Sequence, residues 1–263
     1  MSLVLNLYRY RQYILQNAWH DLRIRYAGSG MGIVWNVLLP LLEVIIFTTV
    51  FSQIMSMRGS DFRASYGYIL YLCSGLFPWF TFAGTVTRGG QSFHSNARYL
   101  TKLPIPEEIF VAKFTVVETF ILVIYLVLLV VVGPILGQPL GWANLLLPVV
   151  GILFQLLGFG LALLLSSLTI FFRDISHVLS IIMRLWLWLT PIIYLESMLS
   201  PRVLAVFRWN PAFFYVKSFR ELFLENQIPA WTTWSIMVAW AAGFILLGYF
   251  VLQKLRPEIR DVL

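Results

Sequence analysis

Charged side chains are scarce in this sequence. Asp, Glu, Lys and Arg make up 12% of its 263 residues, whereas 59% of the residues are hydrophobic. A soluble globular chain has about 25% charged and about 45–50% apolar residues. Too few polar side chains are present to cover a surface in water. The composition therefore excludes an ordinary soluble protein and indicates that lipid is the main solvent.

Residues that carry enzymatic or metal chemistry are also few. The single cysteine, Cys73, lies inside an apolar run and cannot form an intramolecular disulfide. The three histidines, His20, His94 and His177, have no metal-ligand spacing. Neither a GxxxxGKS/T phosphate loop nor a GxSxG nucleophile motif occurs. The sequence predicts no metal site and no cofactor on this chain. A membrane-bound transferase with Asp174 beside His177 remains as the enzymatic alternative.

Ionisable residues are sparse inside the apolar runs. Only Glu43, Glu118 and Arg184 lie well within them. An ion-coupled carrier is expected to place several ionisable groups at this depth, so the pattern argues against one. Two interpretations remain open: a structural ion pair of Arg184 with Glu43 or Glu118, or a site in a transport path. Either way, the driving energy is expected to come from another chain.

The apolar runs predict an all-α integral membrane protein. A helix that crosses the bilayer needs about 20 apolar residues. Residues 1–263 are therefore interpreted as a single transmembrane domain with six transmembrane helices. The predicted spans are 31–57, 67–87, 109–133, 144–171, 177–195 and 231–252.

The distribution of Lys and Arg predicts how these spans are oriented. The net charge of +7 is interpreted as orientation information and not as affinity for nucleic acid. Most Lys and Arg residues fall at the termini and in 88–113, and fewer fall in the segments between the other spans. The sequence therefore predicts that both termini, including a tail at 253–263, and residues 94–108 are cytoplasmic.

The polar connections contain further amphipathic patterns. Within residues 1–30, Leu15, Trp19, Leu22 and Tyr26 share one helical face flanked by basic residues. This pattern predicts a cytoplasmic amphipathic helix in the membrane interface that contacts lipid headgroups, although an ordinary lead-in helix is the alternative. The long connector 196–230 is too polar to span the bilayer and too apolar for a free loop. We expect short re-entrant or interfacial helices there, before span six.

The segment HSNARYLTKLPIPEE, residues 94–108, separates spans two and three. Asn96, Tyr99, Leu100 and Leu103 recur at helical spacing, and Pro104 then prevents the helix from continuing. A short helix with apolar side chains and basic flanks is suited to a groove on a cytoplasmic partner. A solvated turn with a helix-like pattern remains the alternative.

Several motifs occur along the whole chain in a characteristic order. They are DLRIRYAGSGMGIVWNVLLPLL, FPWF, NARYLTKLPIPEEIF, FFRD, LTPIIY, an NP pair, and LRPEIRDVL at the end. Together they resemble the ABC-2-type permeases that export bacterial polysaccharides such as O-antigen, capsule and teichoic acid. Each motif alone is weak, but the ordered set is fairly specific.

This resemblance implies a permease subunit of an ATP-driven exporter in the cytoplasmic membrane, carrying a lipid-linked polysaccharide. Two permease copies would work with two separate ATPase subunits, which would bind the ATP and Mg. The segment after span two would be the coupling helix that docks on the ATPase. An ABC-2-type permease for a lipid or a drug is the alternative. By resemblance, the coupling residues are Ser95, Asn96, Tyr99, Leu100, Lys102 and Leu103.

Aromatic residues are abundant, with 21 Phe, 12 Tyr and 10 Trp. Sugar rings pack their C–H faces on aromatic rings, while Tyr and Trp also offer polar groups to hydroxyls. Such residues would suit a path for a glycan, although aromatic belts at the membrane surface are the competing explanation. The predicted path residues are Trp35, Phe47, Phe77, Trp79, Trp186, Trp188 and Tyr194.

Overall fold

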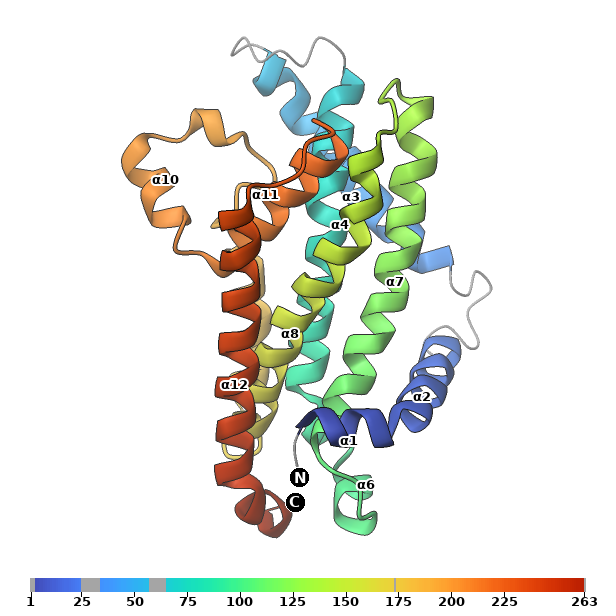
Figure 1. The fold of residues 1–263 in the computed structure, drawn as a ribbon, viewed down its shortest axis with the longest axis vertical. Helices are drawn as coiled ribbons and strands as arrows, with labels where there is room; N and C mark the ends of the chain where they lie inside the picture. Colours follow the sequence, from blue (N-terminus) through green and yellow to red (C-terminus); the bar gives the residue numbers. More distant parts are fainter. Residues whose placement is uncertain (1–2, 25–33, 57–64, 173, 263) are drawn as a thin grey trace.

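The computed structural model describes residues 3–24, 34–56, 65–172 and 174–262, and within these ranges the fold is helical without a β-strand. Four long helices run along the length of the molecule, with α12 at one side (Figure 1). They are α4 (Ser65–Gly90), α7 (Glu108–Ile135), α8 (Leu147–Thr169) and α12 (Trp231–Val262). A 3-10 turn, η2 (Trp142–Leu146), leads into α8.

Among the described residues, four segments are long and apolar enough to cross a bilayer, which makes this a multi-pass membrane protein. They correspond to the predicted second, third, fourth and sixth spans. α12 continues to Val262, so the predicted tail at 253–263 is largely an extension of this helix. The four segments are Gly67–Gly90, Glu108–Ile135, Trp142–Thr169 and Trp231–Ile259.

The first and fifth predicted spans correspond to α3 (Trp35–Ser56) and α9 (Ile175–Trp188). α3 has 22 residues, but its apolar part within the described chain is only Leu38–Val50. α9 has 14 residues and is therefore only about 21 Å long. The predicted fifth span, 177–195, is thus not one continuous helix. Pro191 cannot donate a backbone hydrogen bond, and the chain turns there.

The two chain ends lie at the same end of the molecule as α6 (Ala97–Lys102), as Figure 1 shows. α10 (Pro201–Phe207) and α11 (Pro211–Phe223) lie toward the opposite end. We call these the α6 end and the α11 end. Each of the four long helices runs between the α6 end and the α11 end. The polar segments that connect these helices therefore lie at one end or the other.

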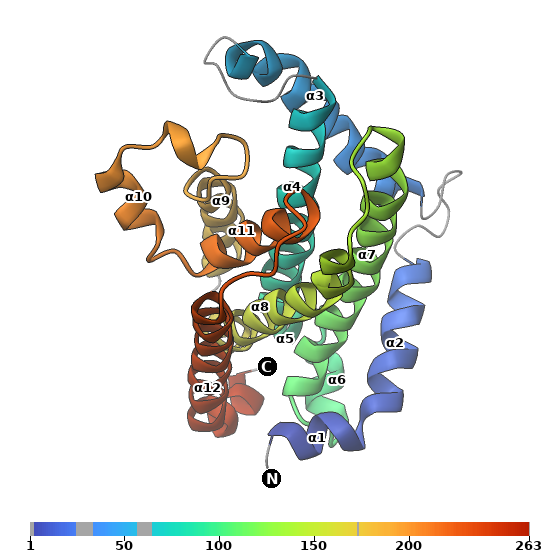
Figure 2. The ribbon, with the colours of Figure 1, turned by 45° about the horizontal axis from the view of Figure 1, so that its top comes forward.

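The N-terminal segment forms α1 (Leu3–Arg9) and α2 (Arg11–Ile24). α2 lies alongside α7, on the side away from α12 (Figures 1 and 2). Leu22 is buried, whereas Leu15 and Trp19 are exposed. Only part of the predicted apolar face of α2 therefore packs against the rest of the chain. The exposed Leu15 and Trp19 suit a membrane-interface helix. Tyr26 and the rest of 25–30 lie outside the described residues.

The connector before α12 contains the predicted pair of short helices. Ser200 and Asn210 cap α10 and α11, each accepting a hydrogen bond from a backbone N–H of the first turn. A proline follows each cap, at a position where its missing N–H is not needed. α11 is mostly buried, with Tyr215 and Phe219 fully enclosed. It is therefore an inserted helix and not a surface loop.

Packing in the centre depends on close helix contacts. A Cβ atom added at Gly160 of α8 would lie 2.5 Å from the backbone nitrogen of Ile245 on α12. A Cβ atom at Gly248 would lie 2.5 Å from the carbonyl oxygen of Gly160. Only glycine permits this approach of two backbones, as is common for helices packed within membranes.

Candidate functional site

The segment after the second predicted span folds into two short helices, α5 (Ser92–Ser95) and α6. α6 ends at Lys102, and α7 begins at Glu108. The non-helical stretch between them contains Pro104 and Pro106, as the sequence predicts. α5 and α6 lie at the same end as the two termini (Figure 1), so the predicted coupling residues are on an extremity of the molecule.

The predicted docking face of α6 is divided between the interior and the surface. Asn96 and Leu100 are buried, with Leu100 only 1% exposed. Leu100 packs in a cluster with Phe93 and Ile109 of the same chain, because this face of the short helix closes the end of the bundle. The inclusion of Asn96 and Leu100 in an exposed docking face is therefore wrong. Four predicted coupling residues are exposed: Ser95, Tyr99, Lys102 and Leu103.

Two consecutive carboxylates hold the α6 end together. Glu107 and Glu108 are fully buried where the chain enters α7. Arg256 of α12 lies 2.8 Å from Glu107 and 2.6 Å from Glu108. Asn6 of α1 donates a 2.7 Å hydrogen bond to the other oxygen of Glu108. These contacts join α1, α7 and α12 beside α6. The adjacent acidic pair before an apolar span was the signal in the sequence for this buried charge cluster.

A further ion pair fixes the N-terminal segment to the bundle. Lys113 of α7 lies 2.8 Å from Asp21 of α2, and Lys113 is mostly buried. The side chain of Trp19 contacts Phe120 edge to face, with 6.4 Å between ring centroids. An ion pair and an aromatic contact thus hold α2 against the N-terminal half of α7. Leu15 of α2 is exposed.

The charges within the spans are paired differently from the prediction. Glu118 lies 3.4 Å from Arg88 at the end of α4. In the described chain, Arg184 makes no ion pair with Glu43 or Glu118, and both Glu43 and Arg184 are exposed. The proposed pairing of Arg184 is therefore wrong within one chain. Arg88 directly follows the predicted second span, 67–87, but its long side chain reaches the carboxylate of Glu118.

The Arg88–Glu118 pair borders a small pocket of about 190 Å³ between α3, α4 and α7. Trp35, one of the predicted path residues, also lines it. Nearby, Gln155 of α8 hydrogen bonds with Thr81 and Thr85 of α4. Polar groups within a bilayer require such partners, because no water is available to satisfy them.

The predicted path aromatics occupy different environments. Phe77 and Trp79 are buried at 2% exposure, whereas Trp188 is 48% exposed. Trp186 packs edge to face on Trp79 at 6.0 Å, and its ring N–H donates to Asn210. Phe47 and Tyr194 are partly buried against the core. The predicted set is therefore not one continuous exposed surface, and its role in transport stays a prediction.

The histidines do not form a metal site. His94 and His177 lie around one polar pocket of about 390 Å³ at the α6 end, with Gln91, Ser95 and Ser176. Across the ranges that the structure describes, no group of three His, Cys, Asp or Glu side chains could hold a metal ion. The backbone N–H of His177 donates to the carbonyl oxygen of Asp174, and among the described residues no hydrogen bond or ion pair joins their side chains.

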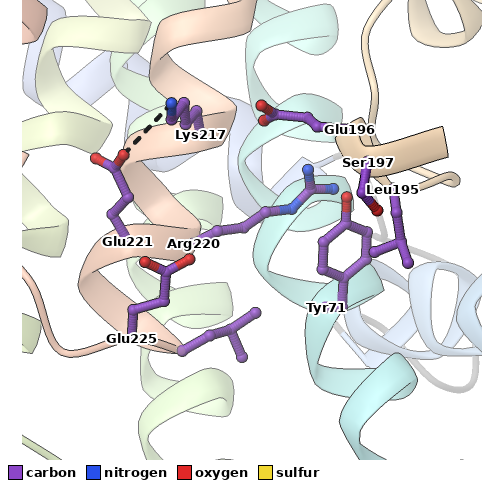
Figure 3. Close-up of a pocket in the computed structure, with 9 residues that line it drawn as sticks. Tyr71, Leu195, Glu196, Ser197, Lys217, Arg220, Glu221 and Glu225 are labelled. Atoms are coloured by element: carbon purple, nitrogen blue, oxygen red, sulfur yellow. Dashed lines mark ion pairs between the residues drawn. The ribbon is translucent and has the colours of Figure 1, made fainter. Parts of the chain in front are cut away.

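A pocket with charged walls lies at the α11 end and measures about 570 Å³ (Figure 3). Arg220 of α11 forms its buried wall. The Arg220 guanidinium donates to the carbonyl oxygens of Pro191 and Ile192 and lies 3.6 Å from the ring centroid of Tyr71. Arg220 belongs to the connector 196–230, and the sequence did not predict its burial. The aromatic residues around Arg220 in α11 were the only sign in the sequence that this arginine would be buried.

Similarity to known proteins extends over nearly the whole chain. The O-antigen export system permease protein RfbA of Myxococcus xanthus is 28% identical, covering 93% of this chain and 95% of its own length. RfbA of Klebsiella pneumoniae is 28% identical, covering 92% of each. The polysialic acid transport protein KpsM of Escherichia coli is 23% identical over 90% and 91%. The family model for ABC-2 type transporters matches residues 12–224, and the chain belongs to this family.

Proposed function

We propose that this protein is the permease subunit of an ATP-driven exporter that carries a lipid-linked polysaccharide across the cytoplasmic membrane. One observation carries the proposal. The relatives named for O-antigen export and polysialic acid transport match 90–93% of this chain, and not one shared motif alone. Their names give O-antigen or polysialic acid as the cargo.

The fold and the charges support a particular arrangement in the membrane. α3 and α9 lie in the bilayer together with the four long helices, giving six membrane-inserted elements. An even number of crossings agrees with both termini lying at the α6 end (Figure 1). Arg9, Arg98, Lys102, Lys113 and Arg256 gather at this end. By the positive-inside rule, the α6 end is cytoplasmic and the α11 end faces outward.

Energy comes from a partner chain. The sequence lacks a phosphate-binding loop, so ATP and Mg bind to separate ATPase subunits. The exposed side chains of α5 and α6 provide the docking surface: Ser95, Tyr99, Lys102 and Leu103. The working complex contains two permease copies and two ATPase subunits. The buried cluster of Glu107, Glu108 and Arg256 transmits movement of this surface to α7 and α12.

The decisive experiment is deletion of the gene followed by analysis of lipid-linked glycans. We expect a polysaccharide on its lipid carrier to accumulate inside the cell and to disappear from the surface, with recovery on complementation. Affinity purification should recover an ATPase subunit with the permease, and the permease alone should hydrolyse no ATP. Normal surface glycan in the deletion strain, with altered lipid or drug efflux instead, would refute polysaccharide as the cargo.

A further inference from the structure

The pocket at the α11 end is built from one face of an inserted helix. Lys217, Arg220, Glu221 and Glu225 recur along this face of α11 and its C-terminal end, and all four line the pocket. The opposite face, including Phe219 and Phe223, is buried in the core. Glu196 closes the far side of the pocket across from Arg220 (Figure 3). The charged side chains of α11 thus line this pocket, whereas the opposite face of the helix is buried in the core.

Two buried polar atoms of this pocket lack a hydrogen-bond partner in the described part of the chain. They are Nε of Arg220 and one carboxylate oxygen, Oε2, of Glu221. Arg220 is only 6% exposed, and its two terminal nitrogens are already used by backbone carbonyls. A buried donor and a buried acceptor left unpaired are both costly. A ligand that both donates and accepts hydrogen bonds would satisfy them.

The chemistry of the walls limits what this ligand is. No three acidic or histidine side chains among the described residues have metal-binding geometry, so a bound metal ion does not explain the three carboxylates. Three carboxylates face two cations, which disfavours an anionic ligand. The volume of about 570 Å³ falls within the range of small-molecule sites, about 300–1,000 Å³. Hydroxyl groups match these walls, because each hydroxyl donates to a carboxylate or accepts from Arg or Lys.

We infer that this pocket binds an uncharged or amino sugar unit of the glycan as the chain emerges at the α11 end, and that it discriminates against acidic sugars. This inference rests on the proposed export of a glycan and names the class of sugar that the permease favours. Glu196, Glu221 and Glu225 accept hydrogen bonds from sugar hydroxyls, and Lys217 donates to them. Arg220 holds the buried wall in place through the carbonyls of Pro191 and Ile192.

The test measures binding of defined oligosaccharides to the full-length protein in lipid nanodiscs. The probes are maltoheptaose, which is neutral, a glucosamine hexamer, which carries amino groups, and a sialic acid hexamer, which is anionic. We expect saturable binding of the first two and none of the third. Glu225→Gln and Glu196→Gln should each weaken binding about tenfold, since a hydrogen bond to a charged group is lost.

The matched control is Glu258→Gln, an exposed carboxylate at the α6 end, which should leave binding unchanged. Binding of the sialic acid hexamer in preference to the others would overturn the inference. So would unaltered binding in both pocket variants, or no binding of any probe.

Failure of the inference can be distinguished from failure of the proposed function. If a deletion strain accumulates glycan, but Glu196→Gln and Glu225→Gln export it normally, the permease role stands and the pocket is not a sugar site. If oligosaccharides bind in the pocket and the deletion strain exports its glycan normally, the sugar site stands and the proposed cargo is wrong.

Discussion

The guanidinium of Arg256, near the end of α12, lies 2.6 Å from the carboxylate of Glu108 at the start of α7. These residues are 148 positions apart in the sequence. Glu107 and Glu108 are fully buried, so this contact neutralises charges that have no access to water. A buried carboxylate is tolerated only when it is paired and hydrogen-bonded. The contact therefore ties the last helix to the segment that follows α6.

Replacing Arg256 with alanine should destabilise the protein strongly. The change would leave two buried carboxylates without their cation, and loss of one partner of a buried pair costs about 3–5 kcal/mol. We expect a markedly lower unfolding temperature in detergent or nanodiscs. Lys254→Ala, an exposed cation two residues away, should have little effect. Equal stability of the two variants would show that the cluster does not hold the α6 end together.

Substitutions in α6 should separate folding from partner docking. Leu100→Ala should lower the free energy of unfolding by about 2–5 kcal/mol, because Leu100 is 1% exposed and its removal leaves a cavity. Tyr99→Ala should leave the unfolding temperature nearly unchanged, because Tyr99 is 57% exposed. Scanning fluorimetry on the purified permease measures both effects.

Substitution of Tyr99 also tests the docking surface. Tyr99→Ala should reduce the amount of ATPase subunit recovered with the folded permease and should reduce export. Ala97→Ser, a small change on the same helix, serves as the control. Wild-type recovery of the ATPase and normal export in Tyr99→Asp, the more severe variant, would show that α6 is not the coupling element.

The ion pair between Arg88 and Glu118 predicts a measurable coupling. A double-mutant cycle with Arg88→Gln and Glu118→Gln should give roughly 0.5–1 kcal/mol, toward the low end because the Arg88 side chain is 45% exposed. A cycle with Arg184→Gln and Glu118→Gln should be additive. Coupling in the second cycle and additivity in the first would restore the pairing expected from the sequence. Unfolding temperatures of the four variants in each set supply the data.

Hydropathy and turn chemistry were sufficient to predict much of the architecture. Long apolar runs predicted the four long helices, and Pro104 and Pro106 predicted where α6 would end. The connector 196–230, too polar to span the bilayer and too apolar for a free loop, predicted the short helices α10 and α11. These features depend on neighbouring residues, so the sequence contains the information directly.

Contacts between distant segments were less accessible from the sequence. The spacing of Leu100 with Tyr99 and Leu103 indicated an amphipathic helix, but spacing does not reveal whether its apolar face meets the same chain or a partner. The positions of Glu118 and Arg184 along their predicted spans indicated a similar depth in the bilayer. Depth does not show toward which neighbouring helix each side chain points. The burial of Arg220 was not evident from its neighbours in the sequence, because the carbonyl groups that accept its hydrogen bonds lie 29 and 28 residues away.

The orientation in the membrane can be tested with single cysteines in a Cys73→Ala background. Cys73 is buried, so its replacement removes background labelling with little change to the surface. An impermeant maleimide added to outer-permeabilised cells should label Arg202→Cys in α10. It should label Ser95→Cys in α5 only after the inner membrane is opened. Labelling of Ser95→Cys in cells with an intact inner membrane would invert the proposed topology.

Alanine substitutions of Trp79 and Trp188 distinguish a residue that packs in the core from one that could contact the glycan. Trp79 is 2% exposed and contacts Phe82 and Trp186, so Trp79→Ala should destabilise the protein by about 3–5 kcal/mol. Trp188 is 48% exposed, and its backbone carbonyl, not its ring, accepts the hydrogen bond of Tyr194. Trp188→Ala should therefore fold normally.

If the Trp188 ring guides the glycan, Trp188→Ala should reduce surface polysaccharide severalfold while membrane levels of the permease stay normal. Recovery of the ATPase subunit and basal ATP hydrolysis by the assembled complex should also persist, because the proposed function places the nucleotide site on another chain. Trp209→Ala is the matched control, since Trp209 is 80% exposed on the α10 segment and outside the predicted path set. Equal export by the two variants would assign Trp188 to the membrane surface and not to the path, because an aromatic belt residue contributes anchoring without contacting the cargo.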